Sequence, residues 1–186
     1  MAGLPRRARD LSLLDALDSF DREPFKQQVW RATRSGRDPT QGAPSRSRWG
    51  DGGFDVLYTS LELDGALAEI HALLSAQPVF PSKDRRFAHR LRLSAERTLR
   101  LADLPTLARL GVDVSRYAER DYSRTREIAD AAYFLDFDGL LAPSARWNCL
   151  NAVLFTGRLG AGQIEVAESA ADPVDWAAWR KRGRVE

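Results

Sequence analysis

The chain has 186 residues, of which 44% are hydrophobic and 29% are charged, and its formal net charge is +2 at pH 7. This length and apolar content predict one folded domain rather than a disordered chain, and the small net charge does not favour a nucleic-acid-binding protein. The single cysteine, Cys149, and the two histidines, His71 and His89, exclude an internal disulfide framework and a Cys- or His-rich metal centre.

The N-terminal stretch predicts a short amphipathic helix. Leucines recur at helical spacing over residues 10–20, and Asp10 is a suitable N-cap. Acidic residues interrupt the apolar run, which is not typical of a secretory signal, and no apolar run reaches the roughly 18 residues that span a bilayer. We therefore expect a cytoplasmic protein without membrane spans, in which residues 1–27 form a helical extension and residues 28–186 form the main domain.

Two short strands flank a long loop at the start of the main domain. Residues 28–32 and 55–60 have the apolar and β-branched composition of strands. The segment between them, residues 33–53, contains seven glycines and prolines and four arginines: Arg34, Arg37, Arg46 and Arg48. A loop of this length inside a small domain is typical of a functional segment.

Helices and strands follow one another irregularly through the rest of the chain. Residues 63–77 have helical apolar spacing and end before Pro78, and Glu69 lies on the shoulder of the buried face, where a carboxylate can reach a pocket rim. Gly111 is expected just after one helix, and Ser123 is expected to cap another. Further helices are expected at 105–110, 123–135 and 173–181, and further strands at 87–93, 98–101, 139–142, 151–155 and 163–166. Because no regular βαβ alternation occurs, the pattern indicates an α+β fold with a largely antiparallel sheet.

The sequence contains no phosphate-binding loop, no dinucleotide-binding fingerprint, no metalloprotease helix motif and no calcium-binding loop. What remains is a set of polar residues in or beside apolar strands and helices, where a scaffold can present functional groups. They are Arg31, Arg48, Tyr58, Glu69, Ser144 and Asn151. Taken singly, each also fits a structural role, such as a surface ion pair, a core tyrosine or a turn serine.

Taken together and in order, these residues resemble the RES domain, a family named for an arginine, a glutamate and a serine. Here the three would be Arg31, Glu69 and Ser144. The resemblance runs from about Val29 to about Val166, through the segments WRATRSGRDP, SRWGDGGFDVLYTSLELDGALAEIHALL and GLLAPSARWNCLNAVLF.

Two positions depart from the family pattern, while two further residues follow it. The usual Gly-Arg-Trp element appears as Ser47-Arg48-Trp49, and Cys149-Leu150 stands where the family often has glycine before its asparagine-containing strand. Tyr58 matches the family's strand tyrosine, and Asn151 matches its asparagine.

The resemblance implies a compact fold like that of ADP-ribosyltransferases, with NAD+ as the substrate in a cleft between sheet and helix. It implies Glu69, Arg31 and Ser144 as catalytic residues. It also implies that NAD+ is bound by Arg31, Arg48, Tyr58, Ser144 and Asn151. In that arrangement Glu69 would stabilise the positive charge that develops on the ribose, arginine forks would hold the pyrophosphate, and Tyr58 would stack on a base. This chemistry needs no metal.

The resemblance also implies a toxin that arrests growth and is neutralised by an Xre-type helix-turn-helix antitoxin, which we expect to cover the cleft. The acceptor of ADP-ribose stays open. Transfer to a protein, with phosphoribosyl pyrophosphate synthetase a target type in the family, is slightly favoured over hydrolysis or phosphorolysis of NAD+. A non-catalytic binding module and a nuclease are alternatives from other classes. The N-terminal helix either mediates a homodimer or packs on the sheet, and no direct contact with nucleic acid or a membrane is expected.

Overall fold

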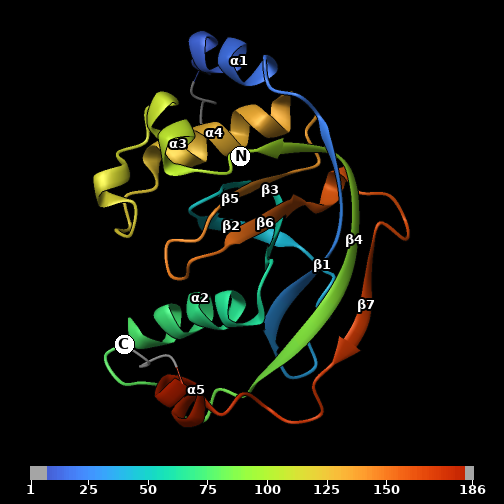
Figure 1. Ribbon diagram of the computed structural model, residues 1–186, viewed down its shortest axis with the longest axis vertical. Helices are drawn as coiled ribbons and strands as arrows, with labels where there is room; N and C mark the ends of the chain where they lie inside the picture. Colours follow the sequence, from blue (N-terminus) through green and yellow to red (C-terminus); the bar gives the residue numbers. More distant parts are fainter. Residues whose placement is uncertain (1–7, 183–186) are drawn as a thin grey trace, which may run out of the picture.

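The structure is a computed structural model that describes residues 8–182, so the outer ends of the two predicted segments, residues 1–7 and 183–186, lie outside the described residues. Over that range the chain forms one seven-stranded sheet with helices on two sides (Figure 1). The strands are β1 (Glu23–Arg34), β2 (Ala43–Ser47), β3 (Gly50–Ser60), β4 (Arg86–Arg100), β5 (Gly139–Pro143), β6 (Leu150–Phe155) and β7 (Ile164–Ser169). Their order is β1-β3-β6-β5-β4-β7, with β2 on β3, and β4–β5 is the one parallel pairing among the described residues. The predicted α+β fold with a largely antiparallel sheet is confirmed.

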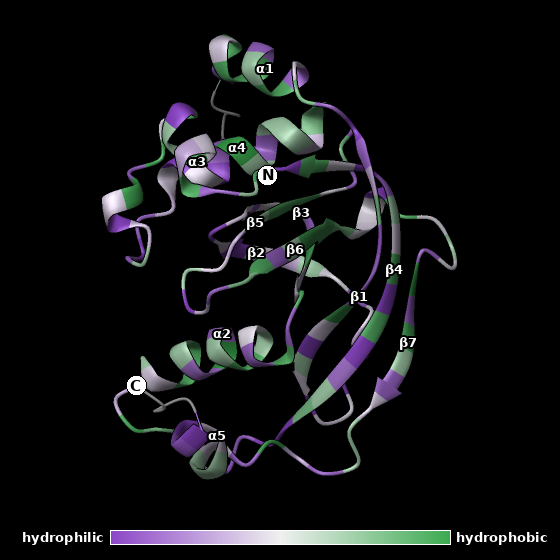
Figure 2. Ribbon diagram, viewed as in Figure 1, coloured by the Kyte–Doolittle hydropathy of each residue, from purple (hydrophilic) through white to green (hydrophobic). Residues whose placement is uncertain are grey.

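Five of the strands pair with one another in a closed ring. β1 pairs with β4 over nearly its whole length and with β3 through Trp30 and Ser60, so that β1, β3, β6, β5 and β4 form a continuous circuit. One buried apolar cluster takes residues from all five strands and therefore lies inside this circuit: Phe25, Val29, Leu57, Leu91, Leu93, Ala95, Leu141, Ala152 and Leu154. Figure 2 shows hydrophobic and hydrophilic residues alternating along β4, as expected of a strand with one buried face. The strands predicted at 87–93 and 98–101 form this single strand, which ends at Arg100.

The helices lie in two groups on either side of the strands (Figure 1). They are α1 (Leu11–Asp18), α2 (Leu63–Ser75), α3 (Leu104–Arg109), α4 (Ser123–Phe134) and α5 (Trp176–Arg182), with short 3-10 turns at Val114–Arg116 and Thr156–Arg158. α1, α3 and α4 share one core with β5 and β6, whereas α2 and α5 share another with β1. No helix in the described part of the chain is long and apolar enough to cross a membrane.

Helix ends follow the local signals with one exception. Asp10 caps α1, since its Oδ1 accepts hydrogen bonds from the backbone N–H of Ser12 at 3.0 Å and of Leu13 at 3.3 Å. Gly111 follows α3 with a φ of 85°, the left-handed conformation that favours glycine. The expectation that Ser123 caps α4 is wrong. Ser123 is the first residue of the helix, and its backbone N–H and hydroxyl both donate to Asp121.

The N-terminal helix α1 packs on α4 rather than directly on the sheet. Leu13 and Leu17 are buried in the core that α4 shares, which accounts for one face of the helix. Leu11 is exposed on the other face, so self-association through α1 stays a prediction.

The prediction of a long loop at residues 33–53 is wrong, because most of this segment is strand. β1 continues to Arg34, and β2 and β3 form a hairpin in which Ser47 pairs with Gly50 across a two-residue turn. Pro44 lies in β2, an edge strand where proline is accommodated, whereas residues 35–42 connect β1 to β2 without strand structure. A Cβ on Gly50 would lie 2.6 Å from the Ser45 carbonyl oxygen, so the turn requires glycine there.

Asp138 joins α4 to the strand circuit, and its removal should destabilise the fold. The buried carboxylate accepts hydrogen bonds from the backbone N–H of Glu96 at 2.7 Å and of Arg97 at 2.8 Å. Because Asp138→Ala leaves these donors without their acceptor, we expect the free energy of unfolding to fall by about 2–3 kcal/mol in urea denaturation. The exposed Asp172→Ala should change it by less than about 0.5 kcal/mol. Equal effects of the two substitutions on the free energy of unfolding would contradict this stabilising role of Asp138.

Candidate active site

Three of the predicted site residues meet at one carboxylate oxygen. Glu69 lies on α2, Ser144 directly follows β5, and Asn151 lies in β6. The Ser144 hydroxyl donates to Glu69 Oε1 at 2.7 Å, and Asn151 Nδ2 donates to the same oxygen at 3.0 Å. Residues of β5 and β6 come together here because the two strands are antiparallel neighbours. Within residues 8–182, Glu69 Oε2 accepts no hydrogen bond, so one oxygen of the carboxylate is fixed and the other is available.

The backbone after β5 fixes the direction of the Ser144 hydroxyl. Its oxygen accepts hydrogen bonds from the backbone N–H of Arg146 at 3.1 Å and of Trp147 at 3.2 Å. The Ser144 backbone N–H in turn donates to the Cys149 carbonyl oxygen at 2.9 Å, which closes the loop in the absence of the family's usual glycine. With two donors on its oxygen, the hydroxyl directs its own proton to Glu69. Ser144 therefore orients the carboxylate.

Asn151 offers an unused acceptor beside Glu69. The residue is 8% exposed, and its Oδ1 has no hydrogen-bond partner in the described part of the chain. Buried polar atoms in native proteins are nearly always paired, so an unpaired amide oxygen beside a cavity suits a ligand N–H or O–H.

Arg31 is a partly buried cation on β1. Its Nη1 donates to the carbonyl oxygens of Pro39 at 2.9 Å and Gln41 at 3.1 Å. Burial, and then repulsion by Arg37, lower the pKa of the Arg31 guanidinium to about 10, so it remains charged at neutral pH. No carboxylate of residues 8–182 forms an ion pair with it. The rest of the guanidinium is thus available to an anion.

Arg48 lies at the turn of the β2–β3 hairpin between two aromatic rings. Its Cζ is 4.4 Å from the centroid of the Tyr117 ring and 4.7 Å from that of Tyr122. The two tyrosines were not predicted as site residues. Nothing in the sequence signals them, because they lie far along the chain from Arg48 and belong to no motif.

Tyr58 is in the cavity wall, but its hydroxyl serves the hairpin. The oxygen accepts a hydrogen bond from the Trp49 backbone N–H at 2.7 Å and also bonds to the Ser47 hydroxyl. Burial raises the pKa of the Tyr58 phenol to about 12, so it stays protonated. Ser47, which departs from the family's glycine, is therefore part of this network, and stacking of Tyr58 on a base stays a prediction.

A cavity of about 670 Å³, here called the active-site cavity, collects these groups. Five of the six predicted residues line it, and Ser144 lies just behind Glu69. Glu69 is the one carboxylate in the lining, against eight arginines: Arg31, Arg34, Arg37, Arg46, Arg48, Arg86, Arg120 and Arg146. Arg34 and Arg86 pair with Asp84, whereas no carboxylate of residues 8–182 pairs with the other six. The volume lies within the usual range for small-molecule sites, and the charge suits an anionic ligand.

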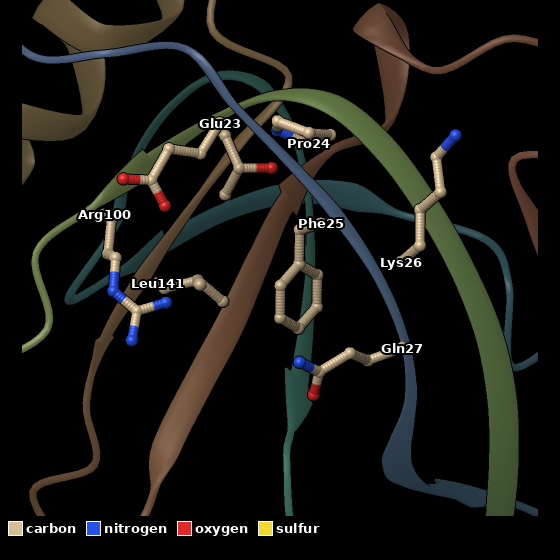
Figure 3. A pocket seen from close by; sticks show the side chains of 8 residues that line it. Glu23, Pro24, Phe25, Lys26, Gln27, Arg100 and Leu141 are labelled. Atoms are coloured by element: carbon tan, nitrogen blue, oxygen red, sulfur yellow. The ribbon is translucent and has the colours of Figure 1, made fainter.

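A smaller hollow of about 250 Å³ opens at one end of the strand circuit (Figure 3). It is lined by Glu23, Pro24, Phe25, Lys26, Gln27, Thr98, Arg100 and Leu141. The hollow shares no residue with the active-site cavity and contains none of the predicted site residues. Among residues 8–182, no three His, Cys, Asp or Glu side chains are grouped so that they could hold a metal ion.

His89 lies beside Arg31 on the neighbouring strand and should make stability depend on pH. Its Nε2 bonds to the Thr33 hydroxyl at 2.9 Å and its Nδ1 to the Ser169 hydroxyl at 2.8 Å. Burial first, and the charge of Arg31 second, lower the pKa of His89 below its ordinary value of about 6.5.

The unfolded chain therefore binds a proton at a higher pH than the folded one, and the free energy of unfolding falls as the pH drops through about 6.5. We expect His89→Gln to reduce this loss between about pH 7 and pH 5, measured by urea denaturation at several pH values. His71, whose pKa burial also lowers, is present in both proteins, so the difference between their slopes reports on His89 alone. Parallel slopes would contradict the prediction.

Comparison with known proteins gives three findings. The family model described as RES domain matches residues 28–177. The chain is 34% identical over 141 residues to the probable NAD(+) phosphorylase Rv3189 of Mycobacterium tuberculosis strain H37Rv, which covers 73% of this chain and 66% of that protein. The chain thus matches just under two thirds of this relative's length. A chain of the crystal structure of the M. tuberculosis MbcT-MbcA toxin-antitoxin complex has the same fold, with a TM-score of 0.82, 20% identity and coverage of 94% of this chain and 98% of that one.

Proposed function

Because the chain belongs to the RES domain family, we propose that its active-site cavity binds NAD+ and cleaves the bond between nicotinamide and ribose, and that the protein acts as a toxin by this reaction. One observation carries the proposal. A single carboxylate, Glu69, is fixed by Ser144 and Asn151 in a cavity whose other charged lining residues are all arginines. The name of the M. tuberculosis relative, a probable NAD(+) phosphorylase, supports the same substrate.

The charges of the cavity fit both ends of this substrate. The pyrophosphate of NAD+ is a double anion, and guanidinium groups bind such oxygens through paired N–H donors. Arg31 and Arg48 lack carboxylate partners in residues 8–182, so neither has to give up an ion pair to bind the pyrophosphate. The Asn151 Oδ1 can accept from a ribose hydroxyl or from the nicotinamide amide, which satisfies its unpaired oxygen.

Glu69 acts beside C1 of the ribose, the carbon that becomes positively charged as nicotinamide leaves. As the C–N bond breaks, its electron pair goes to the nicotinamide ring, which leaves neutral, and C1 of the ribose becomes electron-poor. A carboxylate held beside that carbon stabilises the transition state more than the ground state. Ser144 and Asn151 hold Oε1 so that the negative charge need not reorient during the reaction.

We further propose inorganic phosphate as the acceptor of ADP-ribose. The relative's name supports this acceptor. So does the number of arginines, since the six without carboxylate partners exceed what one pyrophosphate needs and leave cationic groups for a second anion. Attack of a phosphate oxygen on C1 of the ribose gives ADP-ribose 1-phosphate. Transfer to a protein, which the sequence analysis slightly favoured, and transfer to water are the competing outcomes.

A product assay with NAD+ labelled in its adenylate part tests the proposal. The purified protein is incubated with labelled NAD+ in buffer with and without inorganic phosphate, and with added cell extract. We expect labelled ADP-ribose 1-phosphate that depends on phosphate. Free ADP-ribose in every buffer would favour hydrolysis, and label on one protein band would favour protein transfer. Unchanged NAD+ under all three conditions would contradict the proposed function.

A protein partner is proposed to control this reaction. The neighbour in fold was crystallised in a toxin-antitoxin complex. We propose that this chain also has an antitoxin, of the Xre helix-turn-helix type, and that the antitoxin covers the active-site cavity. Co-expression of the neighbouring gene should therefore suppress toxicity, and the purified complex should consume no NAD+. A complex as active as the free protein would contradict the proposed position of the antitoxin.

A further inference from the structure

Tyr117 lies behind the active-site cavity and bonds to the strand end that carries Ser144. The residue follows the Val114–Arg116 turn and is 7% exposed. Its hydroxyl donates to the Pro143 carbonyl oxygen at 2.8 Å. Pro143 is the last residue of β5 and directly precedes Ser144, so this hydrogen bond fixes the backbone from which the Ser144 hydroxyl reaches Glu69.

The ring of the same tyrosine supports Arg48. The guanidinium carbon lies 4.4 Å from the ring centroid, and the Tyr122 ring supports it as well. A cation over an aromatic face is attracted by the ring without being neutralised, whereas a carboxylate partner would cancel its charge. Two rings therefore hold Arg48 in place and leave its charge for an anionic ligand.

The backbone around Arg48 is fixed from the same side. Arg126 on α4 donates from Nε to the Ser47 carbonyl oxygen at 2.8 Å and from Nη2 to the Arg46 carbonyl oxygen at 2.9 Å. The hairpin turn thus cannot shift freely while α4 and the preceding segment stay in place. The sheet and α4 already join this hairpin to β5, and Tyr117 adds a direct link between the segment before α4 and the strand end next to Ser144.

We propose that Tyr117 is a positioning residue that sets the distance between the anion-binding Arg48 and the Ser144–Glu69 pair, and so aligns NAD+ for cleavage. The inference rests on the proposed function. Tyr117 does not line the active-site cavity, so it acts through its two neighbours. Its hydroxyl holds the backbone next to Ser144, which bonds to Glu69, and its ring holds the guanidinium of Arg48.

Two substitutions separate these contacts. Tyr117→Phe keeps the ring under Arg48 and removes the bond to Pro143, so kcat should fall about fivefold while KM for NAD+ stays unchanged. Tyr117→Leu removes both contacts, so KM should also rise about tenfold. A merely structural role would lower the amount of folded protein without splitting kcat from KM in this way. Tyr133→Phe is the control, because it removes the hydroxyl of a tyrosine that stacks on Phe54 outside the active-site cavity.

A double-mutant cycle tests the link to Arg48. The effects of Tyr117→Leu and Arg48→Ala on KM should not add, because both remove the same anion-binding contact, whereas Tyr117→Phe and Arg48→Ala should add. Circular dichroism and thermal unfolding check that each variant folds. Should the leucine variant fail to fold, the kcat of Tyr117→Phe relative to the Tyr133→Phe control still decides the role of Tyr117.

The outcomes distinguish this inference from the function on which it rests. Wild-type protein that consumes no NAD+ refutes the proposed function. Wild-type protein that consumes NAD+, with kcat in Tyr117→Phe no lower than in the Tyr133→Phe control, overturns the role of Tyr117 alone. Fully additive effects of Tyr117→Leu and Arg48→Ala on KM overturn the link to Arg48.

Discussion

Glu69→Gln is expected to lower the rate of NAD+ consumption about a thousandfold and to abolish toxicity in cells, with the fold intact. Glutamine has the size of glutamate, and its side-chain oxygen can still accept the hydrogen bonds from Ser144 and Asn151. The variant lacks only the negative charge that we propose stabilises the developing cation on the ribose. Loss of NAD+ followed by chromatography gives kcat, and thermal unfolding shows whether the protein is folded.

A matched substitution elsewhere controls for the loss of one charge. Glu165 lies exposed on β7 and forms an ion pair with Arg92 at 3.5 Å, so Glu165→Gln should leave kcat unchanged. Glu69→Gln protein that consumes NAD+ at the wild-type rate would remove Glu69 from the mechanism. Glu69→Gln protein that consumes no NAD+ yet still arrests growth would favour the binding module that the sequence left as an alternative.

The parts of this site that the sequence predicts are those with strong local signals. Arg31, Glu69, Ser144 and Asn151 lie in or directly after apolar strands and a helix whose periodicity can be read residue by residue. Elements of regular pattern tell which side chains face inward, and the order of the family's residues supplies the rest. The capping of α1 by Asp10 is a local signal of the same kind.

The parts that the sequence does not predict depend on pairings between distant segments. The sequence of the β2–β3 hairpin resembles a loop because its glycines and prolines are local turn signals. The two segments are strands because they pair with each other, and local signals do not report that pairing. The contact between Tyr117 and Arg48 arises only because the segment before α4 folds back over the hairpin turn. Nothing within a few residues of either side chain reports that approach.

Arg31→Lys should lower kcat/KM for NAD+ about a hundredfold, mainly through KM, although the substitution keeps a basic side chain. Arg31 uses Nη1 to hold the carbonyl oxygens of Pro39 and Gln41, which leaves the remaining N–H groups of the same guanidinium for the pyrophosphate. A single ammonium group cannot serve both, and it lacks the paired donors that match two phosphate oxygens.

Burial adds a second cost for the lysine. The environment that brings the pKa of the Arg31 guanidinium down to about 10 would lower that of an ammonium group from its smaller ordinary value, so part of the charge would be lost as the pH rises. Activity of the Arg31→Lys variant should therefore decline with rising pH where the wild type is constant. Arg92→Lys, on the exposed side of β4, should match the wild type. An Arg31→Lys variant with wild-type KM at every pH would show that the pyrophosphate does not use this guanidinium, and Arg48 would then be the arginine that holds it.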